Sequence, residues 1–271
     1  MRGLVIDPVT KKQLLGLSSD PPQAMLLTGE SGVGLKTIAL EWARTISKNT
    51  GDVEILEPNE KGTITIENIR SLYSSTRARR ESIKTVIIDD ADKMGTDAQN
   101  AFLKLLEEPN SSTGFILTSH TPGKLLPTVL SRLNQVNIRA VSEAESRVLL
   151  ENYSVTQPRL KSQIMFLASG LPAEIVRLCD NETYRSQKLE QAGIAKEFVT
   201  GTRFEQLQLI AKLTSRETAQ EVIRLAIRMV SAQLDKNQNE PILNKLNAML
   251  DVSESLSQNG HVRTQLLRLV I

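Results

Sequence analysis

The sequence predicts an α/β domain built on a parallel sheet, followed by a part made of helices alone. Up to about residue 140, short apolar runs alternate with helical patterns, the order expected when helices join the strands of a sheet. Several runs are apolar at successive positions, as in strands covered on both faces. After residue 141 the strand signal disappears. We expect strands at 24–28, 53–56, 85–89, 114–118 and 135–138.

Helix signals after residue 141 indicate two further parts. Ser142 and Glu145 form a capping box at the start of one helix, and Pro172 opens a later one at a first-turn position. Three short helices make the first of these parts, and longer amphipathic helices make the second. Because an apolar stripe on a lone helix is marginally stable, we expect the last stripes to pack together or on partner subunits. The predicted domains are 1–141, 142–182 and 183–271.

Composition excludes several classes of function. Lys and Arg number 33 against 31 Asp and Glu, so the net charge of +2 cannot bind nucleic acid by bulk charge alone. A single cysteine, Cys179, forbids an intramolecular disulfide and a zinc site of several thiolates from this chain. The apolar run among the first residues is too short for a signal peptide. No apolar stretch approaches the length of about 18 residues that a membrane-spanning helix needs. We therefore expect a cytoplasmic protein with no membrane association.

A glycine-rich turn between the first strand and the next helix has the pattern of an anion site. The segment Gly29-Glu30-Ser31-Gly32-Val33-Gly34-Leu35-Lys36-Thr37 leads directly into a helical pattern. Backbone N–H groups converge in such a turn, and the helix dipole adds about half a positive charge. The candidate nucleotide-binding residues are Gly29, Gly32, Gly34, Lys36 and Thr37.

The loop departs from the working phosphate-binding pattern G-x-x-x-x-G-K-[ST] by one position. Leu35 stands in the lysine slot, and Lys36 stands in the slot of the hydroxyl that binds magnesium. One residue along a helix rotates a side chain by about 100°, so Lys36 is not expected to reach the β- and γ-phosphates. Weak binding of ATP and magnesium stays open, and no other cofactor is assigned. Two alternatives are a one-residue bulge that restores the register and a tight turn that only allows close helix packing.

Adjacent carboxylates follow the third predicted strand. Asp89 stands where nucleotide hydrolases hold the metal-bound water, and Asp90 where a longer Glu normally polarises the attacking water. The missing methylene retracts the second carboxylate by about 1.5 Å, a misplacement of the kind that costs rate. The alternative is a solvated strand end that caps the next helix.

Four segments taken together resemble the AAA+ subunits of bacterial sliding-clamp loaders. They are VIIDDADKM at 86–94, AQNAFLKLLEEP at 98–109, FILTS at 115–119 and KLLPTVLSR at 124–132. The resemblance implies a doubly wound AAA+ domain at 1–141, a three-helix lid at 142–182 and a helical collar at 183–271 that joins five subunits in a ring.

Within this family the chain is most similar to the non-motor, delta-prime type of subunit. Such subunits typically combine a degraded nucleotide loop with a Ser-Arg-Cys arginine finger, which reads Ser131-Arg132-Leu133 in this chain. The resemblance implies that Arg132 acts in trans on the ATP of a neighbouring motor subunit. It also places Ser119 and His120 at the strand-end position that senses nucleotide in active relatives. The four-cysteine zinc module of many family members is missing between the first two strands.

The resemblance implies a non-motor subunit with little ATPase of its own. Its expected partners are the other subunits of a hetero-pentameric clamp loader and, through that complex, the sliding clamp and primer-template DNA. Two other functions stay open: an active ATPase motor subunit of the gamma or tau type, and an AAA+ scaffold reused in another complex.

Basic residues gather before the third predicted strand. They could follow a duplex backbone inside a ring, since phosphate contacts are independent of sequence, or they could form an ordinary solvated helix end. The residues are Arg70, Arg77, Arg79, Arg80 and Lys84.

Overall fold

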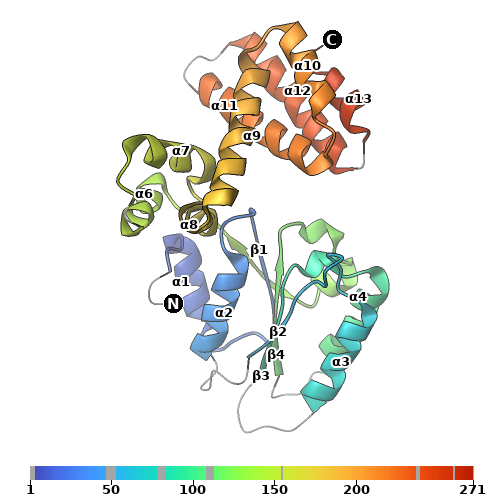
Figure 1. Cartoon of the computed structure of the whole chain (residues 1–271). Helices are drawn as coiled ribbons and strands as arrows, with labels where there is room; N and C mark the ends of the chain where they lie inside the picture. Colours follow the sequence, from blue (N-terminus) through green and yellow to red (C-terminus); the bar gives the residue numbers. More distant parts are fainter. Residues whose placement is uncertain are drawn as a thin grey trace. The chain divides into compact units, whose positions relative to one another are not determined.

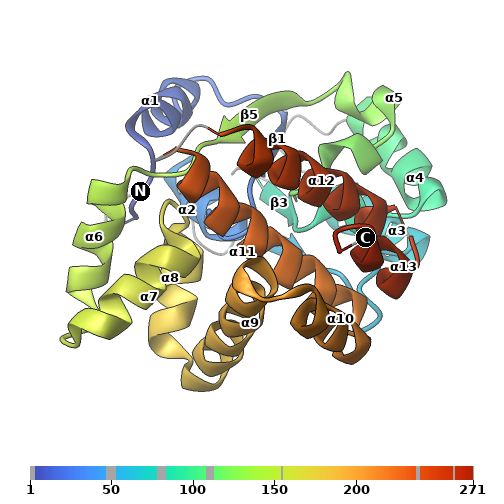
Figure 2. The same cartoon turned by 90° about the horizontal axis from the view of Figure 1, so that it is seen from above.

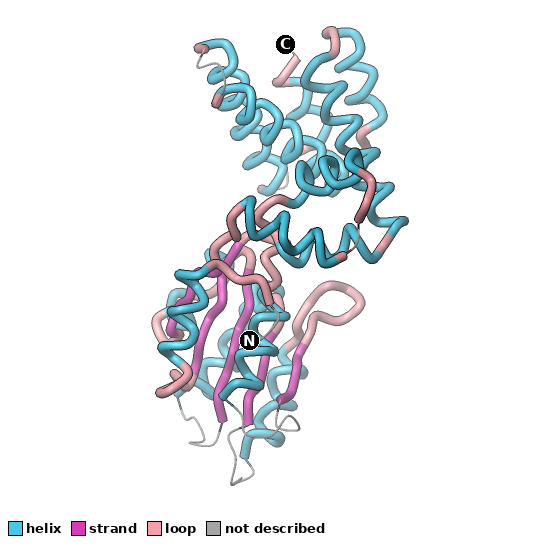
Figure 3. Tube along the Cα trace, turned by 90° about the vertical axis from the view of Figure 1, so that its left-hand side faces the viewer, coloured by secondary structure: helices cyan, strands magenta, loops and turns pink. Residues whose placement is uncertain are grey.

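The computed structural model describes residues 4–46, 53–77, 84–107, 113–153, 155–235, 239–258 and 260–270. The chain divides into two compact units, residues 1–176 and 177–271, and each unit is described by itself. Figure 3 shows strands in the first unit, whereas the second is built of helices. Within the described ranges, no helix combines the length and the apolar character needed to cross a bilayer.

A five-stranded sheet forms the centre of the first unit. Its strands lie in the order β2-β3-β4-β1-β5, and every neighbouring pair is parallel. Each strand predicted from the sequence is confirmed, with ends that differ by at most one residue. The bounds are β1 Ala24–Gly29, β2 Val53–Leu56, β3 Lys84–Ile88, β4 Thr113–Ser119 and β5 Asn134–Ile138.

Helices cover both faces of the sheet (Figure 1). From β1 the chain crosses to the far edge strand β2, and then returns through β3 to β4. Right-handed crossovers in opposite directions place their helices on opposite faces. Accordingly, α1 and α2 lie on one face, and α3 and α4 on the other. Their bounds are α1 Pro8–Leu17, α2 Leu35–Ile46, α3 Ile66–Arg77 and α4 Thr96–Glu107.

Large aromatic side chains anchor both layers of the core. Trp42 of α2 is 1% exposed, and its indole N–H donates to the carbonyl oxygen of Leu14, 3.1 Å away. On the other face, the rings of Phe102 and Phe115 meet edge to face, with centroids 5.3 Å apart. Trp42 and Phe102 are therefore core residues of the first unit.

The capping box predicted for Ser142 and Glu145 is confirmed at the start of α6. Gln99 has the spacing from Thr96 that a capping box needs at the start of α4, but its side chain has a different role. The Gln99 amide is buried, where it donates to the carbonyls of Met94 and Lys124 and accepts from the N–H of Leu126. The further helices are α5 Pro127–Leu130, α6 Glu143–Asn152, α7 Pro158–Ala168 and α8 Pro172–Asp180, with short 3₁₀ turns at Ala91–Lys93 and Pro122–Lys124.

The second unit packs amphipathic helices around α11. Figure 2 shows α11 between α9 and α12, and both of these helices contact it. The apolar stripe on α11 is buried at Val222, Leu225, Ala226 and Val230 and half-buried at Met229. The predicted division of the chain into three domains stays a prediction. The helices are α9 Glu182–Thr200, α10 Arg203–Lys212, α11 Arg216–Leu234, α12 Glu240–Ser257 and α13 Val262–Leu267.

Candidate functional site

The glycine loop lies at the carboxyl edge of the sheet, between the end of β1 and the start of α2. Gly32 and Gly34 have φ angles of +98° and +92°, in the region that L side chains rarely adopt. The loop is therefore a tight turn that leads into a helix N-terminus, as the sequence predicts. Lys36 and Thr37 follow in the first turn of α2, and Thr37 is exposed.

The N-terminus of α8 packs directly on this loop. The backbone N–H groups of Ala173 and Glu174 donate to the carbonyl oxygen of Gly32, at 2.9 and 3.2 Å. A Cβ at Gly32 would lie 3.0 Å from that of Glu174, and one at Gly34 would lie 3.3 Å from that of Ala173. The two glycines thus allow α8 to approach closely. The sequence left open that this turn only allows a helix to pack closely. The helix expected to do so was α2, which follows the turn, but the helix that packs on Gly32 and Gly34 is α8.

Replacing Gly32 with alanine tests this packing. The new Cβ would both crowd α8 and occupy a positive-φ residue, so we expect a loss of about 1–3 kcal/mol in unfolding free energy. Urea unfolding of the purified chain measures it. Gly95→Ala is the matched control, because a Cβ there meets nothing within 4 Å. Equal stability of the two variants would contradict the packing role.

The side chains of Leu35 and Lys36 take different directions from the turn. Leu35 is 2% exposed, so an apolar group is buried in the slot that normally carries the phosphate-binding lysine. The Lys36 ammonium forms an ion pair with Glu57 and lies 3.8 Å from Oδ2 of Asp89. Glu57 follows β2 as Asp89 follows β3, and the pairing of Leu56 with Ile88 brings the two carboxylates to the same edge. Glu57 was missed, although its place directly after a predicted strand could have indicated it.

Thr118, at the end of β4, connects the two predicted carboxylates. Its buried hydroxyl donates to Oδ1 of Asp89 at 2.6 Å and accepts from the backbone N–H of Asp90 at 2.9 Å. Asp90 has φ +49° and ψ +52°, a left-handed conformation that Asp tolerates better than most residues. Thr118 was expected only as a strand residue, because nothing in its local sequence indicates a contact with a residue 29 positions away.

Burial raises the pKa of Asp90, and the nearby charge of Asp89 raises it further. A carboxyl group whose pKa is higher in the folded than in the unfolded chain destabilises the fold when it is ionised. This destabilisation appears at pH values above the ordinary pKa of the group. Asp90→Asn removes this charge and keeps a side chain that tolerates the left-handed conformation. We therefore expect Asn to increase the unfolding free energy at pH 7, with the gain vanishing as the pH falls to the ordinary Asp pKa of 3.8.

Urea unfolding at pH 7 and near pH 3.8 measures the effect of Asp90→Asn. The exposed carboxylate of Asp20 supplies the control variant, Asp20→Asn. A loss of stability at pH 7 in Asp90→Asn but not in the control would contradict the expectation.

The two sensor-like residues have different surroundings. His120 Nδ1 lies 2.8 Å from the carbonyl oxygen of Gly29, and because a carbonyl only accepts, Nδ1 donates. Ser119 is fully buried and donates to Oδ1 of Asp92 at 2.7 Å. The structure therefore brings His120 to the glycine loop and pairs Ser119 with Asp92.

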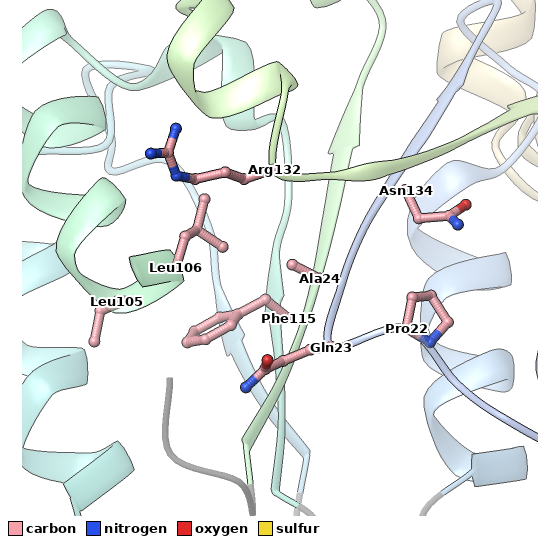
Figure 4. Close-up of a pocket in the computed structure, with 8 residues that line it drawn as sticks. All are labelled: Pro22, Gln23, Ala24, Leu105, Leu106, Phe115, Arg132 and Asn134. Carbon is pink, nitrogen blue, oxygen red and sulfur yellow. The ribbon is translucent and has the colours of Figure 1, made fainter. Parts of the chain in front are cut away.

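Arg132 lies just after α5 and before β5, beside an open cavity of about 210 Å³. Its side chain is 40% exposed. One guanidinium nitrogen, Nη2, donates to Oε1 of Glu107 at 2.8 Å, and the other, Nη1, donates to the carbonyl oxygen of Thr128 at 2.9 Å. Figure 4 shows the residues that line the cavity: Pro22, Gln23, Ala24, Leu105, Leu106, Phe115, Arg132 and Asn134.

Arg132 and the glycine loop lie at opposite edges of the sheet. Asn134, two residues after the arginine, pairs with Met25 near the start of β1, whereas the loop begins after Gly29 at its end. Along β1, Met25 and Gly29 are four residues apart, which corresponds to about 13 Å in a strand. The structure therefore does not bring Arg132 together with the other predicted site residues, and it separates this predicted finger from the glycine loop of the same chain.

The residues of the loop do not fit a magnesium–nucleotide complex. Leu35 presents no charge to a phosphate. The Lys36 ammonium pairs with Glu57 and lies close to Asp89, the carboxylates that would face the metal. In addition, α8 packs on Gly32. Across the described ranges, no group of three or more His, Cys, Asp or Glu residues is arranged to hold a metal ion.

The predicted basic cluster is wrong at Lys84, which belongs to the sheet. Lys84 is 6% exposed and forms an ion pair of 2.5 Å with Glu54 on the neighbouring strand, so it is neither a duplex contact nor a solvated helix end. Arg70 is exposed on α3. Arg79 and Arg80 lie outside the described residues, as does the side chain of Arg77.

Similarity to solved structures defines the fold class. A DNA polymerase III gamma subunit-related protein from Thermotoga maritima gives a TM-score of 0.56 at 18% identity, with 96% of this chain and 97% of that chain covered. The Holliday junction branch migration motor RuvB of Thermotoga maritima gives 0.51 at 16% identity, with 97% and 87% covered. The chain therefore has the AAA+ fold, with a doubly wound parallel sheet followed by helices.

Within the proteins of this fold, the amino-acid sequence is similar to subunits of DNA polymerase III and replication factor C. Residues 17–142 match the family model described as DNA polymerase III, delta subunit. The chain is 29% identical over 189 residues to DNA polymerase III subunit delta' of Pseudomonas aeruginosa, covering 60% of this chain and 58% of that protein. Subunit tau of Escherichia coli is 26% identical over 183 residues, with 58% and 28% covered.

A third relative, the replication factor C small subunit of Methanococcus vannielii, is 32% identical over 176 residues, with 63% of this chain and 54% of that protein covered. The matched region is thus less than two thirds of each of these three relatives. The resemblance to AAA+ clamp-loader subunits that the motifs predict is confirmed, and delta-prime is among the subunits that the chain resembles.

Proposed function

We propose that this chain is a non-motor, delta-prime-like subunit of a DNA polymerase III clamp loader, which supplies Arg132 to the ATP held by a neighbouring motor subunit. The observation that carries the proposal is the separation of the exposed Arg132 from its own, chemically altered glycine loop. An arginine that cannot reach the nucleotide site of its own chain can serve the site of another subunit.

The chemistry of Arg132 supports this role. A guanidinium stays charged at all relevant pH values and offers a planar fork of N–H donors that matches phosphate oxygens. Such fingers stabilise the charge of the phosphoryl-transfer transition state, with effects of ~10³–10⁵ in rate. Hydrogen bonds to Glu107 and to the carbonyl oxygen of Thr128 order the side chain, while its exposure leaves it reachable from outside.

The proposal includes little ATPase activity of the chain itself. Leu35 is buried in the lysine slot, and Asp90 is shorter than the Glu expected there. The alternative of an active motor subunit predicts the opposite. ATP hydrolysis by the purified chain separates the two: no turnover above background agrees with the proposal, and a motor-like rate contradicts it.

The proposed partners are the other subunits of a hetero-pentameric clamp loader, contacted through the helices of the second unit. Phe204 and Leu207 on α10, and Leu243 and Leu250 on α12, are exposed large apolar side chains, with Phe204 69% exposed. Such residues support a role in subunit contact. The sliding clamp and primer-template DNA would be reached through the complex, in the cytoplasm.

Affinity capture with the tagged chain in its native host tests the assembly. We expect the motor and clamp-opening subunits to be recovered together with it in stoichiometric amounts. Recovery of a different complex without these subunits would favour the scaffold alternative and contradict the proposal.

A further inference from the structure

The metal position of the altered nucleotide site holds a positively charged side chain. Lys36 stands in the slot whose hydroxyl coordinates magnesium in a working loop, and its ammonium is paired with Glu57 and lies 3.8 Å from Oδ2 of Asp89. We infer that Lys36 acts as a built-in cation that replaces the divalent metal at the carboxyl ends of β2 and β3.

Electrostatics explains why a cation is needed there. Glu57 and Asp89 leave two neighbouring strands at the same level, because Leu56 pairs with Ile88 and the N–H of Asp89 donates to the carbonyl oxygen of Leu56 at 2.9 Å. Two carboxylates at one edge repel each other unless a positive charge lies between them. The Lys36 ammonium supplies that positive charge as part of the chain itself, so no bound metal ion is needed to neutralise the two carboxylates.

The surroundings hold the Asp89 carboxylate in place for this pairing. Its side chain is 17% exposed, and its second oxygen accepts from the Thr118 hydroxyl at 2.6 Å. A divalent ion approaching Asp89 would meet the ammonium as a like charge. This repulsion over a few ångströms weakens the binding of a divalent ion at Asp89.

This inference is independent of the proposed function. Lys36 lies at the carboxyl edge of the sheet and Arg132 near the opposite edge, so either can fail without the other. The role of Lys36 concerns the altered nucleotide site of this chain, whereas the proposed role of Arg132 concerns the ATP site of a neighbouring subunit.

The test uses Mn²⁺ as a probe, with its free concentration followed by electron paramagnetic resonance. Lys36→Thr removes the ammonium and restores a hydroxyl, so we expect it to bind Mn²⁺ at least about tenfold more tightly than the wild-type chain. Adding Asp89→Asn to this variant should abolish the gain. The control is Lys12→Thr, which makes the same charge change at an exposed position of α1.

A second readout is the melting temperature at constant ionic strength. We expect Mg²⁺ to leave the wild-type value unchanged, and Lys36→Thr to melt about 1–3 °C lower in EDTA and to recover when Mg²⁺ is added. The inference is overturned if wild-type chain binds Mn²⁺ through Asp89 as tightly as the variant does. It is equally overturned if Lys36→Thr binds Mn²⁺ no more tightly than Lys12→Thr.

Discussion

Replacing Arg132 with alanine is expected to slow hydrolysis at the neighbouring ATP site by ~10³–10⁵, the range typical of arginine fingers. The loss arises because no other group would deliver a guanidinium to the developing phosphate charge. The chain itself should remain folded, since the 40% exposed side chain contributes only surface contacts to Glu107 and Thr128. The measurement is DNA-stimulated ATP hydrolysis by a complex reconstituted with its motor subunits, in which only the site beside this chain is left able to hydrolyse.

Two further variants sharpen the Arg132 experiment. Arg132→Lys keeps the charge but loses the planar fork, so we expect it to restore only a small part of the rate. Arg147→Ala is the matched control, because Arg147 is an exposed arginine of the same unit that also pairs with a glutamate, Glu143. An Arg132→Ala complex as active as the Arg147→Ala complex would favour the scaffold alternative.

The second large effect is expected at Glu221, which joins α9 to α11 in the second unit. Its carboxylate accepts from Lys188 at 2.7 Å, and from Nη2 and Nε of Arg224 at 2.8 and 2.9 Å. Burial alone would raise the pKa of Glu221, but the hydrogen bonds and charges of Arg224 and Lys188 outweigh it and lower the pKa to about 2. We expect Glu221→Gln to lose about 2–3 kcal/mol of unfolding free energy at pH 7.

The pH dependence of this loss follows from the direction of the shift. A carboxylate with a lowered folded-state pKa stabilises the fold above its ordinary value of 4.5 and loses that contribution as the pH falls toward 2. Urea unfolding of wild type and Glu221→Gln should therefore differ most at neutral pH and converge between pH 4.5 and 2. Glu190→Gln, an exposed position on α9, is the control. A difference between wild type and Glu221→Gln that stays constant with pH would contradict the ion-pair account.

The three inner strands β1, β3 and β4 could be predicted because each contains a run of apolar residues that parallel packing buries on both faces. The capping box at Ser142 was equally predictable, since both partners lie within four residues of each other. Gln99 shows the limit of such local patterns. Its spacing from Thr96 fits a capping box, but tertiary contacts with Lys124 and Leu126 use its amide instead.

The site was predictable as far as its residues follow strand ends. The glycine loop, Asp89 and His120 all lie at the carboxyl edge of the sheet, where parallel strands place their connections. Contacts that depend on the lateral order of strands were not predictable from the residues alone. Glu57 lies beside Asp89 only because β2 neighbours β3, and Glu107 meets Arg132 only because α4 contacts α5, which Arg132 follows.

The structure of the assembled complex with a non-hydrolysable ATP analogue tests the central claim most directly. We predict that the Arg132 guanidinium leaves Glu107 and lies within about 3 Å of the γ-phosphate bound by the adjacent subunit. An Arg132 side chain still paired with Glu107 beside an occupied neighbouring site, or a magnesium–nucleotide complex seated in the chain's own glycine loop, would contradict it.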